Sequence, residues 1–130
     1  CRIRDKGLLP EKLAIGVDAA GIGDIVDELT TPDRGISAEQ IVAISQGWKL
    51  NGAIKTTERK IAGGQMVHCG SALMAWCVSN ARVVAVGNAI SITKQASGSA
   101  KIDPLMSTFD AVSLMALNPI ASGGKSFWES

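Results

Sequence analysis

The sequence contains no tyrosine, a single histidine and few aromatic residues, which make up 4% of its 130 residues. Rows of stacking rings, with which many proteins hold single-stranded nucleic acid, are therefore not expected. The charge is nearly balanced, because 13 Lys and Arg stand against 12 Asp and Glu and leave a formal net charge of +1. A basic surface over the whole protein is excluded, so any contact with nucleic acid must come from a local patch.

Cysteine is also scarce, with residues only at Cys1, Cys69 and Cys77 and no CxxC pair. An odd, widely spaced set does not suit a disulfide scaffold, and the single His68 cannot complete a four-ligand zinc site. We expect buried or inert thiols in a reducing compartment. No apolar run approaches the ~20 residues of a membrane helix, and no signal peptide opens the chain, so we expect a soluble, cytoplasmic protein.

The apolar content and its spacing predict one α/β domain. Hydrophobic residues make up 46% of the chain, enough for a core. Short apolar runs predict buried strands at 13–17 and 41–45, and Gly87-Asn88 between two apolar runs predicts a hairpin. Helices are predicted at 24–29, 51–62, 71–80 (buried) and 102–117, with a short extended piece at 66–68. This order predicts a mixed sheet flanked by helices, with at least two parallel strands.

Two aspartates at the ends of predicted elements are candidate functional residues. Asp18 ends a strand, at the sheet edge where ligands and catalytic groups collect, although a turn aspartate beside glycines is the plainer interpretation. Asp103, before Pro104, suits ordinary helix capping or a metal-binding carboxylate. Asp110 lies two turns further along the helix, and we do not expect it to share an ion with Asp103.

Other motifs are weaker. The segment 16–23 lacks the third glycine of a dinucleotide fingerprint, since Val26 stands there, and Gly124-Lys125-Ser126 lacks the first glycine of a P-loop, since Pro119 stands there. His68 is expected to be structural. The basic residues of the chain have two interpretations: a helix face exposed to solvent, or a surface that binds the phosphates of nucleic acid. These residues are Lys49, Lys55, Arg59, Lys60, Arg82, Lys94 and Lys101.

Residues 8–119 resemble the C-terminal nuclease domain of tailed-phage and prophage terminase large subunits. No single stretch is specific for this family, but the set of stretches in this order is. The stretches are AIGVD at 14–18, ISQGW at 44–48, AIKTTERK at 53–60, VHCG at 67–70, LMAWCVSN at 73–80, Gly87-Asn88, Lys94 and KIDPLM at 101–106. The order of the last four weighs most.

The resemblance implies a ribonuclease H-like fold that cuts double-stranded DNA with Mg²⁺ or Mn²⁺ during genome packaging, in the cytoplasm of a bacterial host cell. It implies that Asp18 and Asp103 are catalytic metal ligands, which suits the preference of these ions for hard oxygen donors. Lys94, Lys101, Lys55 and Arg59 are the candidates for contact with DNA. The partners implied in the intact system are the terminase ATPase domain, the portal and the small subunit.

The resemblance also implies that the nuclease domain, over residues 1–119, is N-terminally incomplete. From its own residues, the tail at 120–130 is expected to be loose. The chain begins with Cys1 rather than Met, and Asp5 is a poor replacement for the first catalytic aspartate of the family. Two alternatives stay open. One is an inactive prophage remnant that acts as a homo-oligomeric assembly module through exposed strand edges. The other is a small α/β domain that binds a phosphate compound through the loop at 18–23.

Overall fold

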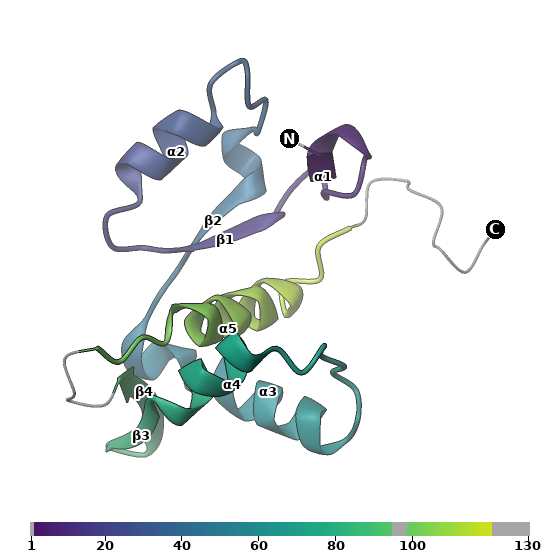
Figure 1. Cartoon of the computed structure of the whole chain (residues 1–130). Coiled ribbons are helices and arrows are strands. Elements are labelled where there is room, and N and C mark those ends of the chain that lie inside the picture. Colours follow the sequence, from purple (N-terminus) through teal and green to yellow (C-terminus); the bar gives the residue numbers. More distant parts are fainter. Residues whose placement is uncertain (1, 95–98, 121–130) are drawn as a thin grey trace. The chain divides into compact units, whose positions relative to one another are not determined.

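The computed structural model describes residues 2–94 and 99–120 of the chain (Figure 1). The described residues pack into two compact units: a first unit of residues 2–44 with 114–120, and a second unit of residues 45–94 with 99–113. The predicted order of strand, helix, strand, helix, helix, hairpin and helix is confirmed. The fold is therefore mixed α/β, as expected. The assignment of residues 1–119 to one partial nuclease domain stays a prediction, and the tail at 121–130 lies outside the described residues.

The first unit is built on two parallel strands. β1 (Ile15–Asp18) pairs with β2 (Ile41–Ile44), so that Asp18 lies opposite Ile44. Parallel strands need a crossover connection, which here contains α2 (Gly23–Leu29) and the 3₁₀ turn η1 (Ala38–Gln40). The short helix α1 (Arg2–Asp5) precedes β1. The two predicted strands and their parallel pairing are confirmed.

The burial predicted for these strands is wrong. Ile44 is the one residue of β1 and β2 that is fully buried, and the others are half-buried or exposed. The reason is that strand side chains are buried only where another element covers a face of the sheet, and α2, the helix between the two strands, buries none of its own residues. Besides Ile44, Ile36 after the turn that follows α2 forms the described core of residues 2–44.

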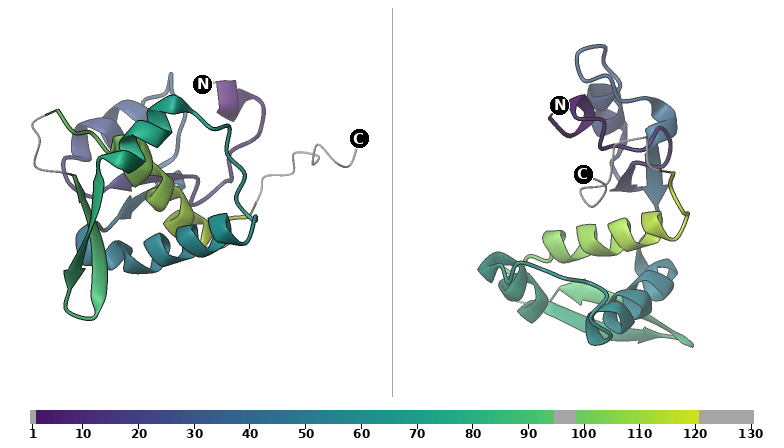
Figure 2. Two further views of the ribbon diagram at one scale, coloured as in Figure 1. Left: turned by 60° about the horizontal axis from the view of Figure 1, so that its bottom comes forward. Right: turned by 90° about the vertical axis from the view of Figure 1, so that its right-hand side faces the viewer.

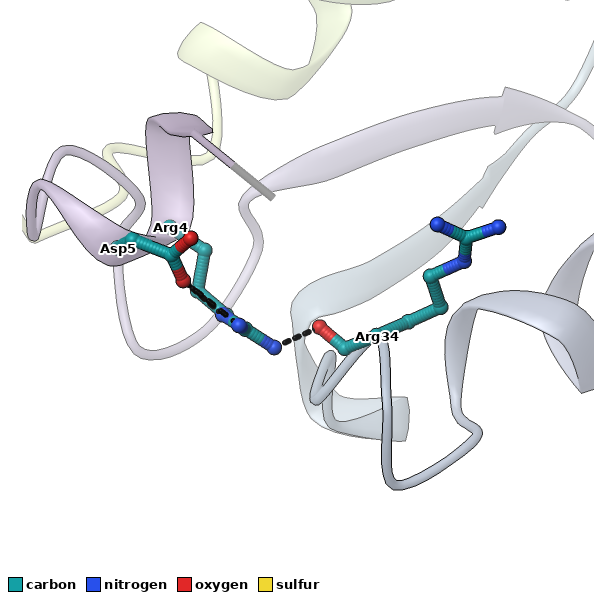
Figure 3. Close-up of polar contacts among 3 residues, drawn as sticks. All are labelled: Arg4, Asp5 and Arg34. Carbon is teal, nitrogen blue, oxygen red and sulfur yellow. Dashed lines mark hydrogen bonds and ion pairs between the residues drawn. The ribbon is translucent and has the colours of Figure 1, made fainter.

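One arginine ties α1 to the turn after α2, as Figure 3 shows. Nη2 and Nε of Arg4 donate to Oδ1 of Asp5 at 2.6 and 2.9 Å, and Nη1 donates to the backbone carbonyl of Arg34. The hydrogen bond from Arg4 lowers the pKa of the Asp5 carboxyl. The Arg4–Asp5 pair joins neighbouring residues, so the hydrogen bond to the carbonyl of Arg34 is the contact that connects α1 to this turn, and both contacts are exposed.

The second unit consists of helices and a hairpin. Its helical elements are η2 (Gly47–Leu50), α3 (Asn51–Ala62), α4 (Ala72–Ser79) and α5 (Asp103–Met115), the last of which continues two residues past the unit. β3 (Ala81–Val86) and β4 (Ala89–Lys94) pair in antiparallel fashion, and their tip extends beyond the helices in the left view of Figure 2. The predicted Gly87-Asn88 turn is confirmed, with φ of +60° at Gly87.

Helix α3 begins and ends where the sequence predicts. Its end is fixed by glycine, because Gly64 takes a φ of +67° and donates to the carbonyl of Ile61, while Gln65 donates to that of Lys60. This pair of hydrogen bonds is the Schellman arrangement, which satisfies the last carbonyls of a helix. The core of the unit draws on η2, α3, α4 and α5. Its buried apolar residues are Leu50, Ile54, Cys77, Ala100, Phe109 and Val112.

The prediction of one mixed sheet is wrong. Among the described residues the strands form two separate two-stranded sheets, β1–β2 and β3–β4. The amide of Ile90, which points away from β3, donates to Oδ1 of Asn51 at 3.0 Å. The side chain of this α3 residue therefore occupies the position at which a third strand would accept the hydrogen bond. Besides its partner β3, β4 lies against η2 and α3 and not against a third strand.

The prediction that α4 is a buried helix is half right. The helix forms, but only Cys77 is buried, while Leu73, Trp76 and Val78 are exposed. An apolar segment without periodic polar positions does not encode which face will pack, and here only one side does. The extended piece expected at 66–68 is a loop without strand pairing. Within residues 2–94 and 99–120, no helix combines the length and apolar character needed to cross a membrane.

The turn held by Arg4 yields a stability prediction. A Cβ added to Gly35 (φ +62°) would collide with Nη1 of Arg4, whereas one added to Gly21 (φ +73°) meets nothing within 4 Å. Both Gly35→Ala and Gly21→Ala force alanine into the left-handed region, which costs about 1 kcal/mol. We expect Gly35→Ala to lower the free energy of unfolding further, measured by urea titration and circular dichroism. Equal losses would show that the contact between Arg4 and the turn is absent in solution.

Candidate functional site

Asp18 closes β1 at the carboxyl end of the parallel pair, as predicted. Its carboxylate is exposed, and Oδ1 accepts a hydrogen bond from the amide of Ala20 at 2.9 Å. The amide of Ala19 donates to the carbonyl of Ile44 at 3.3 Å, which extends the β1–β2 ladder past the strand. The turn interpretation is therefore confirmed for one oxygen of Asp18. The exposed carboxylate keeps room for a ligand at the same edge of the sheet.

Asp103 opens α5 near the open end of the hairpin. Nδ2 of Asn80 donates to the carbonyl of Lys101 at 3.1 Å, two residues before Asp103. Asn80 directly precedes β3, whose first residue, Ala81, lies opposite Lys94. Lys94, Lys101 and Asp103 are all exposed. The structure thus brings the backbones of two predicted phosphate-binding lysines and one predicted metal ligand to one end of the hairpin.

Asn80 is the residue whose importance the sequence alone did not reveal. In the sequence it is only the last residue of the stretch at 73–80, yet its side-chain amide connects α4 and β3 to the segment that leads into α5. The signal that could have identified it is its position, since an amide side chain after the last turn of a helix often bonds to a neighbouring backbone group.

Asp18 belongs to the first unit and Asp103 to the second. That they share a metal ion therefore stays a prediction. In the part of the chain that the structure describes, no three His, Cys, Asp or Glu side chains gather where they could hold a metal ion. Each of the two aspartates would supply one oxygen-donor ligand of a larger set.

Asp110 is buried and structural. Its Oδ1 accepts a hydrogen bond from Nε2 of Gln46 at 2.9 Å, and only 8% of the residue is exposed. A buried carboxylate needs such donors, because an unpaired charge in the interior is costly. This contact connects α5 to the residue before η2, and the expectation that Asp110 shares no ion with Asp103 stays a prediction.

The basic residues of α3 lie on its solvent side. Lys55 and Arg59, four residues apart and so on one face, are both exposed, while Ile54 and Thr57 point into the unit. Just before α3, Nζ of Lys49 lies 5.9 Å from the ring centroid of the exposed Trp48. Their contact with DNA stays a prediction, and the exposure it requires is present.

The thiols and the histidine behave differently from one another. Cys77 is fully buried and Cys69 is exposed, and both are free, whereas Cys1 lies outside the described residues. The expectation of a buried thiol is confirmed at Cys77, and the expectation that the thiols are inert stays a prediction. Nδ1 of His68 accepts a hydrogen bond from the amide of Gly70 at 3.1 Å, which is a local turn contact, and the expectation that His68 has only a structural role stays a prediction.

Comparisons with protein-family models, with curated proteins and with solved structures find no match for the chain. The resemblance to terminase nuclease domains therefore depends on the residues of this sequence.

The contact between Gln46 and Asp110 can be tested by a double-mutant cycle. Gln46→Ala removes a donor from a buried carboxylate, which costs about 1–3 kcal/mol of unfolding free energy. In an Asp110→Ala background the same change should cost much less, because no carboxylate is left to satisfy. Chemical denaturation of the four proteins measures the coupling. An equal cost in both backgrounds would show that the hydrogen bond does not hold α5 to the start of η2.

Proposed function

We propose that the chain is part of a metal-dependent nuclease domain that cleaves double-stranded DNA, similar to the nuclease domain of phage terminase large subunits, with Asp18 and Asp103 as metal ligands. The observation that carries the proposal is the exposed carboxylate of Asp18 at the carboxyl end of a strand in a parallel pair. This edge is where ligands bind in open α/β sheets. The resemblance of residues 8–119 to terminase nuclease domains is the reason for assigning metal binding to that carboxylate.

The metal would be held by hard oxygen donors. Asp18 and Asp103 are exposed carboxylates, the ligand type that Mg²⁺ and Mn²⁺ prefer. When bound, such ions activate water and neutralise charge on the scissile phosphate. The hydrogen bond from the Ala20 amide holds one oxygen of Asp18 and so orients the carboxylate.

The lysines at the open end of the hairpin would position the DNA backbone. Lys94 and Lys101 are exposed near Asp103, so a phosphate contacted by them would lie close to that carboxylate. Lys55 and Arg59 add two positive charges on the exposed face of α3. With a net charge of only +1, the chain depends on such local groups for DNA affinity.

A second candidate, a homo-oligomeric assembly module, is favoured by β3. Val83, Val84 and Val86 are exposed, and β3 has no strand on its other side among the described residues. An open apolar strand edge is a template for pairing with another chain. A chain that is dimeric in light scattering and that fails the Mn²⁺ experiment below would support this candidate.

Paramagnetic Mn²⁺ tests the ligand assignment directly. At substoichiometric Mn²⁺ we expect broadening of the amide signals around Ala20 and Lys101 in a ¹⁵N–¹H spectrum, because a bound ion relaxes nearby nuclei. Asp18→Asn and Asp103→Asn should each reduce the broadening at their own position. Asp27→Asn, which removes an exposed carboxylate from α2, is the control. Broadening that is unchanged in the Asp18→Asn, Asp103→Asn double variant would contradict the assignment.

The salt dependence of DNA binding tests the lysines. If Lys94 and Lys101 each contact a phosphate, replacing both by Gln should lower the slope of log affinity against log salt by about 2. Fluorescence anisotropy with a labelled duplex measures this slope. Lys6→Gln with Lys12→Gln changes the net charge equally at exposed positions of the first unit. Equal effects of the two pairs would show that Lys94 and Lys101 act only through net charge.

A further inference from the structure

A cavity of about 560 Å³ opens in the second unit, walled by α3, α4, α5 and the loop before α4. Its volume lies within the range of about 300–1,000 Å³ that is typical of small-molecule sites. The wall is mostly apolar. Its larger apolar side chains are Ile61, Met66, Met74, Val78 and Leu105. None of the described residues that line it is Lys, Arg, Asp or Glu.

Two of the polar groups in the wall already have partners. Oγ1 of Thr57 donates to the carbonyl of Ala53 at 2.8 Å, and Oγ1 of Thr108 donates to that of Pro104 at 3.0 Å. Both hydroxyls therefore donate their hydrogen bonds within their own helices. They contribute methyl groups and lone pairs to the cavity rather than donors.

His68 supplies a hydrogen-bond donor at this wall. Because its Nδ1 accepts from the amide of Gly70 at 3.1 Å, the neutral ring carries its proton on Nε2. Gly70 takes a φ of +67° in this turn, a conformation that side chains disfavour. Ser71 also lines the cavity, and its side chain makes no capping hydrogen bond to α4. The loop before α4 thus places one histidine and one serine in the wall of an apolar cavity.

We propose that this cavity binds a small, mainly apolar molecule, such as an aromatic ketone, that carries one hydrogen-bond acceptor. The apolar walls favour the ring or chain of the ligand, and Nε2 of His68 donates to its oxygen. A phosphate or another strongly charged ligand does not suit a wall without Lys or Arg. The site is separate from the proposed nuclease residues, because Asp18, Asp103, Lys94 and Lys101 do not line it.

The ligand class can be tested with two probes of nearly equal shape. Acetophenone has an aromatic ring and one carbonyl acceptor, whereas ethylbenzene has the ring without the oxygen. Titrated into the ¹⁵N-labelled full chain, acetophenone should shift the amide signals of Thr57, Gly70 and Thr108 saturably. Ethylbenzene should shift the same signals and measures the affinity of the ring alone, against which the effect of a His68 variant on acetophenone is compared. Signals that do not move with either probe would overturn the proposal.

Variants then locate the bound probe. Ala75→Trp fills the cavity from α4 and should abolish the shifts, whereas Ala72→Trp makes the same change on the same helix outside the cavity and should preserve them. His68→Ala should weaken acetophenone about tenfold and leave ethylbenzene unchanged, which decides the question even if Ala75→Trp fails to fold. Retained binding in Ala75→Trp would overturn the proposal. So would the same shifts on concentrating the protein without a probe, since a second copy would then occupy the cavity.

Discussion

The hydrogen bond from the Ile90 amide to Oδ1 of Asn51 is the contact on which the arrangement of the second unit depends. It joins the first residue of α3 to the second residue of β4, so the hairpin is fixed against the helix. Because an unpaired backbone donor in a half-buried position costs free energy, the contact also specifies register along β4. It closes the edge of β4 at this point, and the sheet therefore stops at two strands on that side.

The position of the hairpin determines what lies at its open end. Ala81 and Lys94 are paired there, and Asn80, one residue earlier, holds the carbonyl of Lys101. The chain thus enters α5 beside the start of β3, and Asp103 follows. The lysines and the aspartate are brought near one another by backbone contacts, not by attraction between their own charges. Their functional use would then require no rearrangement of the hairpin.

Local signals in the sequence predicted the elements well, because each element has a local cause. Gly87 supplies the positive φ of the hairpin turn, and Gly64 ends α3. Burial was predicted poorly, because it depends on partners distant in sequence. α4 has no polar face to indicate its exposed side, and only Cys77 is buried. The prediction of a single mixed sheet was wrong for the same reason. Nothing near Ile90 in the sequence indicates that its amide donates to the side chain of Asn51.

The candidate site shows the same division between local and distant causes. The position of Asp18 follows from an apolar run that ends at a glycine-containing turn, and its bond to the Ala20 amide is two residues away. That bond does not separate the turn interpretation from the metal interpretation, since ligating carboxylates are themselves held by hydrogen bonds. The bond fixes the orientation of the side chain, because a carboxylate oxygen that accepts one hydrogen bond still has a second lone pair. If Asp18 held a metal ion as proposed, both of its oxygens would therefore stay available, and the turn would hold the carboxylate in place.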